Sequence, residues 1–356
     1  MTFSILLFLT LTGQLQAKTS NKITHTDISN AVKIEANKLL NDSRFSSVSI
    51  GVVSDSQAIT EHFGELTKTQ GNTPTDNTLY EIASVSKTMT GLIAAYAVSE
   101  GKLSLDENIN VYIDNSMEQL STKQTPVTIR ELVTHTSGLP RDSAELGLTS
   151  ETLTRSAFLM AVNRYDPSKT KGKYNYSSVG TELLSFILET IYQTPFDTLL
   201  QQVLSSKADM HNTKVNLDEL ALKNFAFGYD DKNEVAIAHI EHNVLWGGSG
   251  YIKSNMSDLT KYMKLQLQQQ NPVITESHKK LFHVEGTDYL AYFWIAADDE
   301  QLGTYYIHHG GLESTQNWMI IFPKYNLAVS VISNSSFEAA AGLLRSAGMN
   351  IIKKLI

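Results

Sequence analysis

Apolar residues follow the period of a strand near both ends of the chain and the period of a helix between them. From Ile28 to Leu39 they recur on one helical stripe, which predicts a helix capped by Thr26 and Asp27. Two short apolar runs come next, one from Val48 to Ser54 and a second that ends at Phe63. A polar turn separates them, so we expect a β-hairpin.

The central part of the chain has a mainly helical pattern. An apolar helix is expected from Ser84 to about Gly101, where the glycine is a suitable C-cap. Polar loops separate it from further expected helices at 128–133, at 178–192 and from about Ser257 onward. This region therefore predicts a largely helical unit.

Strand patterns return near the C-terminus, and a helix closes the chain. We expect strands at Tyr289–Ala296, Thr304–His308, Gln316–Phe322 and Leu327–Ser333, and a final helix at Phe337–Leu355. Strands at both ends with helices between them predict a discontinuous α+β fold of three layers (αβα), in which N- and C-terminal helices flank an antiparallel sheet. The sheet domain would comprise residues 18–90 and 276–356, and the inserted, mainly helical domain residues 91–275.

Composition narrows the classes of function. The chain has 356 residues, 42% of them hydrophobic, which is enough for a sizeable core. Its net charge of −8 and the lack of a basic run argue against nucleic-acid binding. It has no cysteine, which excludes disulfides, thiolate catalysis, cysteine-based metal sites and a lipid-modified N-terminal cysteine.

The first residues have the pattern of a signal peptide. An apolar block from Phe3 to Leu11 is too short to span a bilayer comfortably, and cleavage can follow Ala17. The alternative is an uncleaved N-terminal anchor. No later run approaches membrane length, so we expect residues 1–17 to be removed and the mature protein to be a monomer that is periplasmic or secreted.

Ser84 and Lys87 form the candidate catalytic pair. Residues three apart share a helix face, so both side chains can reach a common space. A serine hydroxyl needs a nearby base, and a lysine becomes one where burial or cationic neighbours lower its pKa. Three other Ser-x-x-Lys pairs occur, but only Ser84 begins an apolar helix. The alternative is an ordinary N-cap serine followed by a solvated lysine.

Two further segments carry groups that such a pair would use. Tyr176 lies in a loop before a helix and can relay protons as general base and acid; the alternative is a surface aromatic residue. His308-His309-Gly310-Gly311 leaves a strand, and the amide of Gly311, paired with that of Ser84, would make an oxyanion hole. The alternative there is a glycine-rich β-turn.

Metal chemistry has weaker support. His239, Glu241 and His242 lack the i,i+4 histidine pair of zinc peptidases, and a polar loop is the alternative. His135 is interpreted as a hydrogen-bonded structural histidine. We therefore expect no metal and no other cofactor.

With these motifs in this order, the chain resembles the serine β-lactamase and penicillin-binding protein superfamily, in the branch of class C β-lactamases, DD-peptidases and esterases. The resemblance runs from about Val48 to Asn334. Besides the serine–lysine, tyrosine and histidine–glycine motifs, it rests on Thr128–Leu132 with His135–Pro140, on Gly250–Leu259 and on Pro323–Asn334. Several motifs in the right order are far more specific than any one of them.

The resemblance implies a β-lactamase/transpeptidase-like sheet domain with an inserted helical domain. It also implies that Ser84 is the acylated nucleophile, that Lys87 and Tyr176 transfer protons, and that the amides of Ser84 and Gly311 form the oxyanion hole. The residues that fall at substrate-binding positions are Ser178, His308, His309 and Gly310.

The chain departs from the family pattern at recognition positions. Ser178 stands where the family usually has an asparagine that contacts the substrate's acylamide, and a hydroxyl lacks the paired donor and acceptor of an amide. His308 replaces the lysine of typical class C β-lactamases, and we expect it to be only partly cationic near pH 7. Ser314 occupies a position that is commonly glycine. The changes at Ser178 and His308 favour a peptidase or esterase over an efficient β-lactamase.

The sequence thus predicts an exported serine hydrolase that forms an acyl-enzyme on Ser84 and acts on cell-wall D-Ala peptides, β-lactams or esters. Its expected partner is a small-molecule or peptidoglycan-peptide substrate. The rival hypothesis is a non-catalytic penicillin-binding or sensor protein on the same fold, which the joint presence of Ser84, Lys87 and Tyr176 disfavours. A metal-dependent hydrolase comes third.

Overall fold

The structure is a computed structural model that describes most of the chain from residue 22 onward. The described residues are 22–55, 57–113, 126–236, 238–239 and 245–356. The predicted signal peptide, residues 1–17, lies outside them, as do Glu241 and His242 of the metal-site candidate. No helix within the described ranges is long and apolar enough to cross a membrane.

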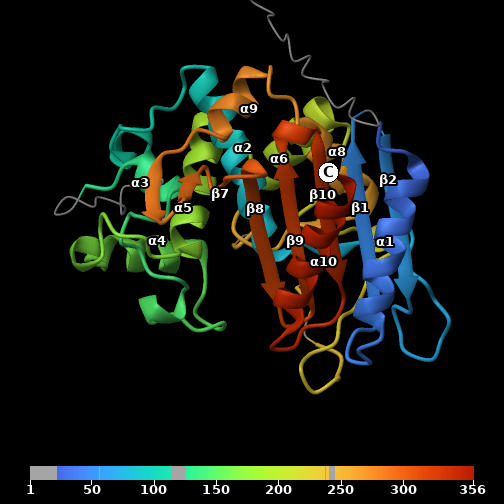
Figure 1. The fold of residues 1–356 in the computed structure, drawn as a ribbon. Helices are drawn as coiled ribbons and strands as arrows, with labels where there is room; N and C mark the ends of the chain where they lie inside the picture. Colours follow the sequence, from blue (N-terminus) through green and yellow to red (C-terminus); the bar gives the residue numbers. More distant parts are fainter. Residues whose placement is uncertain (1–21, 56, 114–125, 237, 240–244) are drawn as a thin grey trace, which may run out of the picture.

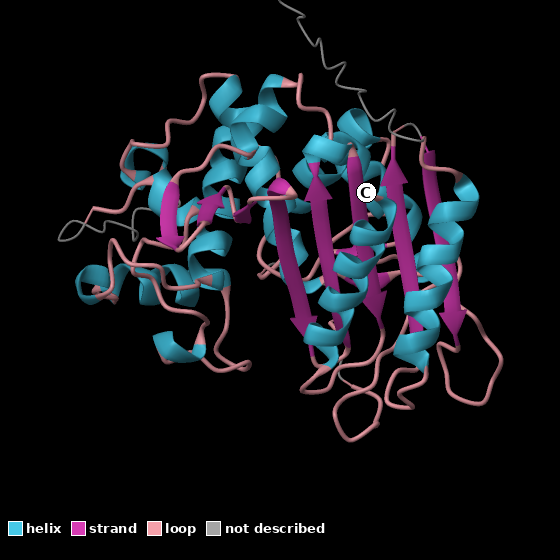
Figure 2. Ribbon diagram, in the orientation of Figure 1, coloured by secondary structure: helices cyan, strands magenta, loops and turns pink. Residues whose placement is uncertain are grey.

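An eight-stranded antiparallel sheet forms the framework of the fold (Figure 2). The strand order is β2-β1-β10-β9-β8-β7-β6-β5, so the N-terminal hairpin lies beside the last strand of the chain. The strands of this sheet are β1 (Ser47–Ser54), β2 (Gln57–Gly64), β5 (Phe282–Glu285), β6 (Asp288–Ala291), β7 (Trp294–Asp299), β8 (Gly303–Leu312), β9 (Thr315–Phe322) and β10 (Leu327–Ser333). A separate pair joins β3 (Tyr80–Glu81) to β4 (Lys253–Ser254).

Helices cover both faces of the sheet. The first and last helices, α1 (His25–Leu40) and α10 (Ala340–Leu355), pack against each other on one face, in front of the sheet in Figure 1. Ile28, Leu344 and Ile351 are fully buried in the core between them and the strands. On the other face, α8 (Met256–Gln266) packs against β1, β2 and β10. The predicted three-layer α+β architecture is therefore confirmed.

The other helices come from the central part of the chain, as the periodicity predicts. They are α2 (Ser86–Ser99), α3 (Ile129–Val133), α4 (Arg155–Arg164), α5 (Ser178–Tyr192), α6 (Phe196–Ala208), α7 (Glu219–Leu222) and α9 (Pro272–Ser277). The helix α2 contacts α5, α6 and α9, and its core residues join those of the α8 face of the sheet in one cluster. The expected domain boundaries, residues 18–90 plus 276–356 and residues 91–275, stay a prediction.

One expected strand is in fact two. The run 289–296 is interrupted at Tyr292 and Phe293, whose φ angles are 44° and 73°. These left-handed residues turn the chain back on itself and produce the antiparallel β6–β7 hairpin. Both side chains are buried aromatics, so the apolar pattern runs through the turn without a break. The prediction of a single strand at this position is wrong.

The first helix and the nucleophile segment begin differently from the prediction. Thr24, not Thr26, caps α1: the Thr24 hydroxyl accepts the N–H of Asp27 at 3.2 Å, and the Asp27 carboxylate accepts the N–H of Thr24 at 2.9 Å. Ser84 lies before α2, in the short 3-10 helix η1 (Ala83–Val85), and its hydroxyl caps neither element. The N-cap alternative for Ser84 is therefore wrong, and its hydroxyl stays available for other contacts.

Candidate active site

Ser84 lies where the sheet meets the helical part of the chain. The turn η1 packs against β8 and β9 and leads directly into α2. The residue before the serine, Ala83, is buried and has a φ angle of 48°. A non-glycine residue in this left-handed conformation is strained and persists only where its surroundings hold it. Half-buried Ser84 therefore sits on a turn whose shape the neighbouring elements impose.

Two side chains converge on the hydroxyl of Ser84, as the sequence predicts. The Tyr176 hydroxyl donates a hydrogen bond to Ser84 Oγ at 2.7 Å, and Lys87 Nζ donates one at 3.3 Å. The same Nζ lies 4.9 Å from the centroid of the Tyr176 ring. Lys87 has no exposed surface. Two groups that can exchange a proton with the serine are thus in direct contact with it.

The ammonium group of Lys87 has a further partner that no motif indicates. Lys87 Nζ donates a hydrogen bond to the backbone carbonyl of Ser249, in the loop before β4. One turn along α2, the Thr90 hydroxyl donates to the carbonyl of Gly248 at 2.6 Å. A buried ammonium group without hydrogen-bond acceptors would be energetically costly, and the carbonyl of Ser249 supplies an acceptor. The two hydrogen bonds together also fasten the loop to the helix.

His135 positions the tyrosine. The N–H of Ser177 donates to His135 Nδ1 at 3.1 Å, and the N–H of Asn175 donates to the carbonyl of His135 at 2.8 Å. The imidazole ring also lies 4.5 Å from the Tyr176 ring. Burial, together with the positive charge of Lys87, lowers the pKa of His135 well below its ordinary value, so the ring is a neutral acceptor. The prediction of a hydrogen-bonded structural histidine holds for Nδ1, whereas Nε2 has no hydrogen-bond partner in the described part of the structure.

The second half of the strand β8 borders the site, and in the described sheet one edge of this half has no partner strand. β7 pairs with β8 only as far as Ile307, whereas β9 pairs with it through Leu312. The turn η1 takes the vacant side, so close that a Cβ added at Gly310 would lie 2.3 Å from the carbonyl oxygen of Ile82. The strand expected to end at His308 therefore continues past it, and the β-turn alternative is wrong.

The other predicted site residues lie on the same elements. Gly311 follows in β8, opposite Gln316 of β9, and His309 Nε2 lies 2.7 Å from Gln316 Oε1. Ser178 is the first residue of α5, and its N–H donates to the carbonyl of Arg141 at 2.9 Å. Their contacts with a substrate, and the oxyanion-hole role of Gly311, stay predictions.

His308 is neutral in this environment, although we expected it to be partly cationic near pH 7. It is 5% exposed, and burial, helped by the positive charge of Lys87, lowers the pKa of His308 to about 3. Its Nδ1 lies 2.8 Å from the carbonyl oxygen of His309, where a protonated nitrogen donates. A neutral imidazole cannot attract a substrate carboxylate as the lysine of related enzymes would.

His239, the described member of the metal-site candidate, is engaged in another contact. Its Nδ1 lies 3.0 Å from Glu81 Oε1, and its ring stacks on Tyr251 at 4.0 Å. The Ser314 hydroxyl donates to Glu81 Oε2 at 2.8 Å, which ties the β8–β9 turn to the strand before Ser84. Within the described ranges no group of three His, Cys, Asp or Glu side chains could hold a metal.

A Ser–His–Asp arrangement elsewhere in the sheet is structural. Ser49 Oγ lies 2.8 Å from His62 Nδ1, and His62 Nε2 lies 3.0 Å from Asp76 Oδ1. Ser49 is fully buried and its Oγ also lies 2.8 Å from the hydroxyl of Tyr80. Because no substrate can reach Ser49, the cluster only fastens β1 and β2 to β3.

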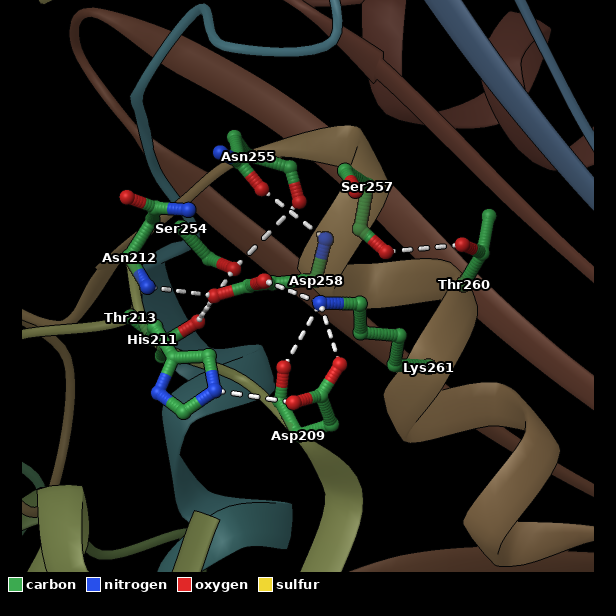
Figure 3. A network of polar contacts seen from close by, with 10 residues as sticks. All are labelled: Asp209, His211, Asn212, Thr213, Ser254, Asn255, Ser257, Asp258, Thr260 and Lys261. Carbon is green, nitrogen blue, oxygen red and sulfur yellow. Dashed lines mark hydrogen bonds and ion pairs between the residues drawn. The ribbon is translucent and has the colours of Figure 1, made fainter. Parts of the chain in front are cut away.

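Four residues of the motif 250–259 belong to a network of polar contacts, which Figure 3 draws. Asp258 is fully buried, and its Oδ2 accepts the N–H of Asn212 at 2.8 Å. Asn255 caps α8 by accepting the N–H of Asp258 at 2.9 Å. Lys261 Nζ lies 3.6 Å from Asp258 Oδ1, on the same helix. This network holds the start of α8 and the neighbouring β4, which in turn pairs with β3 before Ser84.

Comparisons with known proteins agree with this architecture. The sequence matches the family model described as Beta-lactamase over residues 32–349. It is 25% identical over 264 residues to the protein named "Beta-lactamase" of Providencia stuartii, a match that covers 74% of this chain. The chain spans 65% of the length of that relative.

Solved structures share the fold at lower identity. The chain is similar to "A class C beta-lactamase" with a TM-score of 0.83 and 19% identity, over 93% of this chain and 97% of the other. It is also similar to a Beta-lactamase/D-alanine carboxypeptidase from Yersinia pestis, with a TM-score of 0.78 and 21% identity, over 92% and 98% of the two chains. At these identities the likeness concerns the fold alone.

Proposed function

The chain belongs to the Beta-lactamase family, within the serine β-lactamase and penicillin-binding protein superfamily, and we propose that it is an exported serine hydrolase that forms an acyl-enzyme on Ser84. The observation that carries this proposal is the convergence of Tyr176 and Lys87 on Ser84 Oγ, at 2.7 Å and 3.3 Å. A serine held by two proton-exchanging groups is the arrangement that nucleophilic catalysis needs.

In the proposed reaction, Tyr176 or Lys87 acts first in its deprotonated form. It takes the proton of Ser84 as Oγ forms a bond to the substrate's carbonyl carbon, and the carbonyl electron pair moves to its oxygen. The amides of Ser84 and Gly311 stabilise that oxyanion. The proton then passes to the leaving group as its bond breaks, which leaves the acyl-enzyme. A water molecule deprotonated by the same group releases the acyl product and restores Ser84.

The proposed substrates are cell-wall D-Ala peptides, β-lactams or esters. The names of the similar proteins, "Beta-lactamase" and Beta-lactamase/D-alanine carboxypeptidase, support the first two classes. The neutral state of His308 and the short hydroxyl of Ser178 favour substrates that need no cation for recognition, which gives weight to esters over β-lactams and D-Ala peptides, since both of these carry a carboxylate.

Labelling and turnover of the purified protein test the proposal. We expect a fluorescent penicillin to form an adduct that peptide mapping places on Ser84, and we expect hydrolysis of p-nitrophenyl esters. Ser84→Ala should abolish both. Ser99→Ala is the matched control, because Ser99 belongs to another Ser-x-x-Lys pair and is exposed at the end of α2.

Two outcomes would contradict parts of the proposal. The absence of any adduct and of ester turnover would refute the serine hydrolase altogether. Acylation of Ser84 without release of the acyl group would instead indicate a sensor or a penicillin-binding protein without hydrolytic turnover.

A further inference from the structure

A buried glutamate lies behind Lys87 and has no role in the mechanism above. Glu182, in the second turn of α5, is 1% exposed. The Ser249 hydroxyl and the backbone N–H of Trp246 face its carboxylate and, as hydrogen-bond donors, act to lower its pKa. Its Oε2 has no hydrogen-bond partner in the described part of the structure. A carboxylate in this position needs a physical reason, because burial without full pairing is costly.

The apolar surroundings of Glu182 make the burial of its carboxylate energetically costly. Its neighbours in α5, Leu183 and Leu184, are fully buried apolar residues. Burial raises the pKa of Glu182 from 4.5 to about 7. An apolar residue would fill the same space without this penalty, so packing alone does not account for the glutamate.

Glu182 and Lys87 meet through one residue. The hydroxyl of Ser249 faces the Glu182 carboxylate, and the carbonyl of Ser249 accepts a hydrogen bond from Lys87 Nζ. At the other end of the same loop, the N–H of Trp246 also faces the Glu182 carboxylate, and Trp246 has a left-handed φ angle of 65°. Glu182 thus holds both ends of the short loop that presents the carbonyl to the catalytic lysine.

Charged groups face Glu182 from several elements. Lys87 of α2 attracts its negative charge, and Glu189 of α5 opposes it. Arg155 of α4 forms an ion pair with Glu189 at 2.5 Å. Arg155, Glu189 and Asp197 of α6 line, together with Glu182, a cavity of about 360 Å³. Lys87 is therefore the cation that interacts with Glu182, while the other charges either repel it or are paired with each other.

We propose that Glu182 is a positioning residue for the serine–lysine pair. Through Ser249 it fixes the carbonyl that holds Lys87, and the charge of its carboxylate acts on the proton transfers at Ser84. The inference rests on the proposed function, since it concerns the proton transfers that activate Ser84. It assigns to Glu182 an electrostatic effect on the serine–lysine pair, although Glu182 does not contact the substrate.

A pH profile of ester hydrolysis tests the charge. Glu182→Gln keeps the shape and an acceptor oxygen for Ser249 and removes the charge. Loss of a negative charge favours the deprotonated, active form of the base, so the acidic limb of kcat/KM should move to lower pH by roughly half to one unit. We expect kcat to fall about 3- to 10-fold and KM to change less than about twofold, because Glu182 does not contact the substrate.

Glu189→Gln is the matched control, because it removes a carboxylate from the same helix that is paired with Arg155. It should move the acidic limb less than Glu182→Gln does. A purely structural role for Glu182 would lower stability or the active fraction, which penicillin titration measures, without moving the limb. A folded Glu182→Gln variant with an unmoved limb would overturn the inference while the proposed function stands.

A second measurement does not depend on activity. The titration of the Glu182 carboxyl can be followed by carbon NMR in the wild type and in Lys87→Met, with circular dichroism as the test of folding. Without the attraction of the lysine the Glu182 midpoint should rise by several tenths of a unit or more. An unmoved midpoint would refute the coupling, even if the protein proved to have no hydrolase activity.

Discussion

Replacing Glu182 with glutamine should remove a large pH-dependent penalty on folding. Burial raises the pKa of the Glu182 carboxyl from 4.5 to about 7. Below about pH 4.5 the carboxyl is protonated in both folded and unfolded chains, so it contributes no difference. Between the two values the unfolded chain releases the proton while the folded chain keeps it, so stability falls as pH rises. Above about pH 7 the full penalty remains.

The size of the penalty follows from the difference between the two pKa values. One unit corresponds to about 1.4 kcal/mol, so the buried carboxyl of Glu182 costs on the order of 3 kcal/mol above pH 7. Its side chain is 1% exposed, so solvent screening reduces this figure little. A cost of this size is a substantial part of the free energy of unfolding of a typical protein.

Urea unfolding of the wild type and of Glu182→Gln at pH 4.5 and pH 8 measures the effect. The free energy of unfolding of the variant, relative to the wild type, should rise by about 3 kcal/mol between the two pH values. Titrating groups that do not interact with Glu182 are common to both proteins and cancel in this difference, and any packing cost of glutamine is independent of pH. A relative stability that changes by less than about 1 kcal/mol would refute the argument. Glu189→Gln shows what the loss of a carboxylate on the same helix does by itself.

Two further predictions concern β8. Gly310→Ala should lower kcat/KM for esters more than about tenfold and destabilise the fold by about 1–3 kcal/mol, because its Cβ would meet the rigid backbone at Ile82. Gly311→Ala should retain most of the stability and most of the kcat/KM for esters, because only the ends of flexible side chains lie near its Cβ. Equal losses for Gly310→Ala and Gly311→Ala in thermal melts and ester assays would contradict this prediction. His308→Lys should raise kcat/KM for a penicillin relative to a neutral ester at pH 7, since the native pKa of about 3 leaves His308 uncharged. An unchanged ratio of the two substrates would contradict the charge argument.

The order of strands and helices was predictable because burial follows the apolar period directly. The runs at 316–322 and 327–333 became β9 and β10 within one residue of the expected bounds. The turn at Tyr292 and Phe293 was not predictable, since two buried aromatic residues in a left-handed conformation carry no glycine or polar signal. The sequence pattern reports which residues are buried and not how the backbone bends between them.

The parts of the site that depend on side-chain identity were predictable, and the parts that depend on the backbone were not. The contact of Lys87 and Tyr176 with Ser84 could be predicted because each of these residues belongs to a recognisable motif. The carbonyl of Ser249 leaves no trace in the sequence, because every residue has a carbonyl. Glu182 resembles a solvated position of an amphipathic helix, yet every residue of α5 from 179 to 188 is buried.

The surroundings of Ser84 combine rigid backbone supports with uncharged residues at the positions that we predict to bind the substrate. The strained turn at Ala83 is held by β8, where Gly310 packs on the preceding backbone. The positions that we predict to bind the substrate are different: Ser178 and Gly310 are uncharged, His308 is neutral, and burial also lowers the pKa of His309. A substrate carboxylate would therefore meet neutral donors at these positions, which are weaker partners than a cation. We accordingly expect the acyl-transfer chemistry of this family to be retained, with selection by shape and neutral hydrogen bonds.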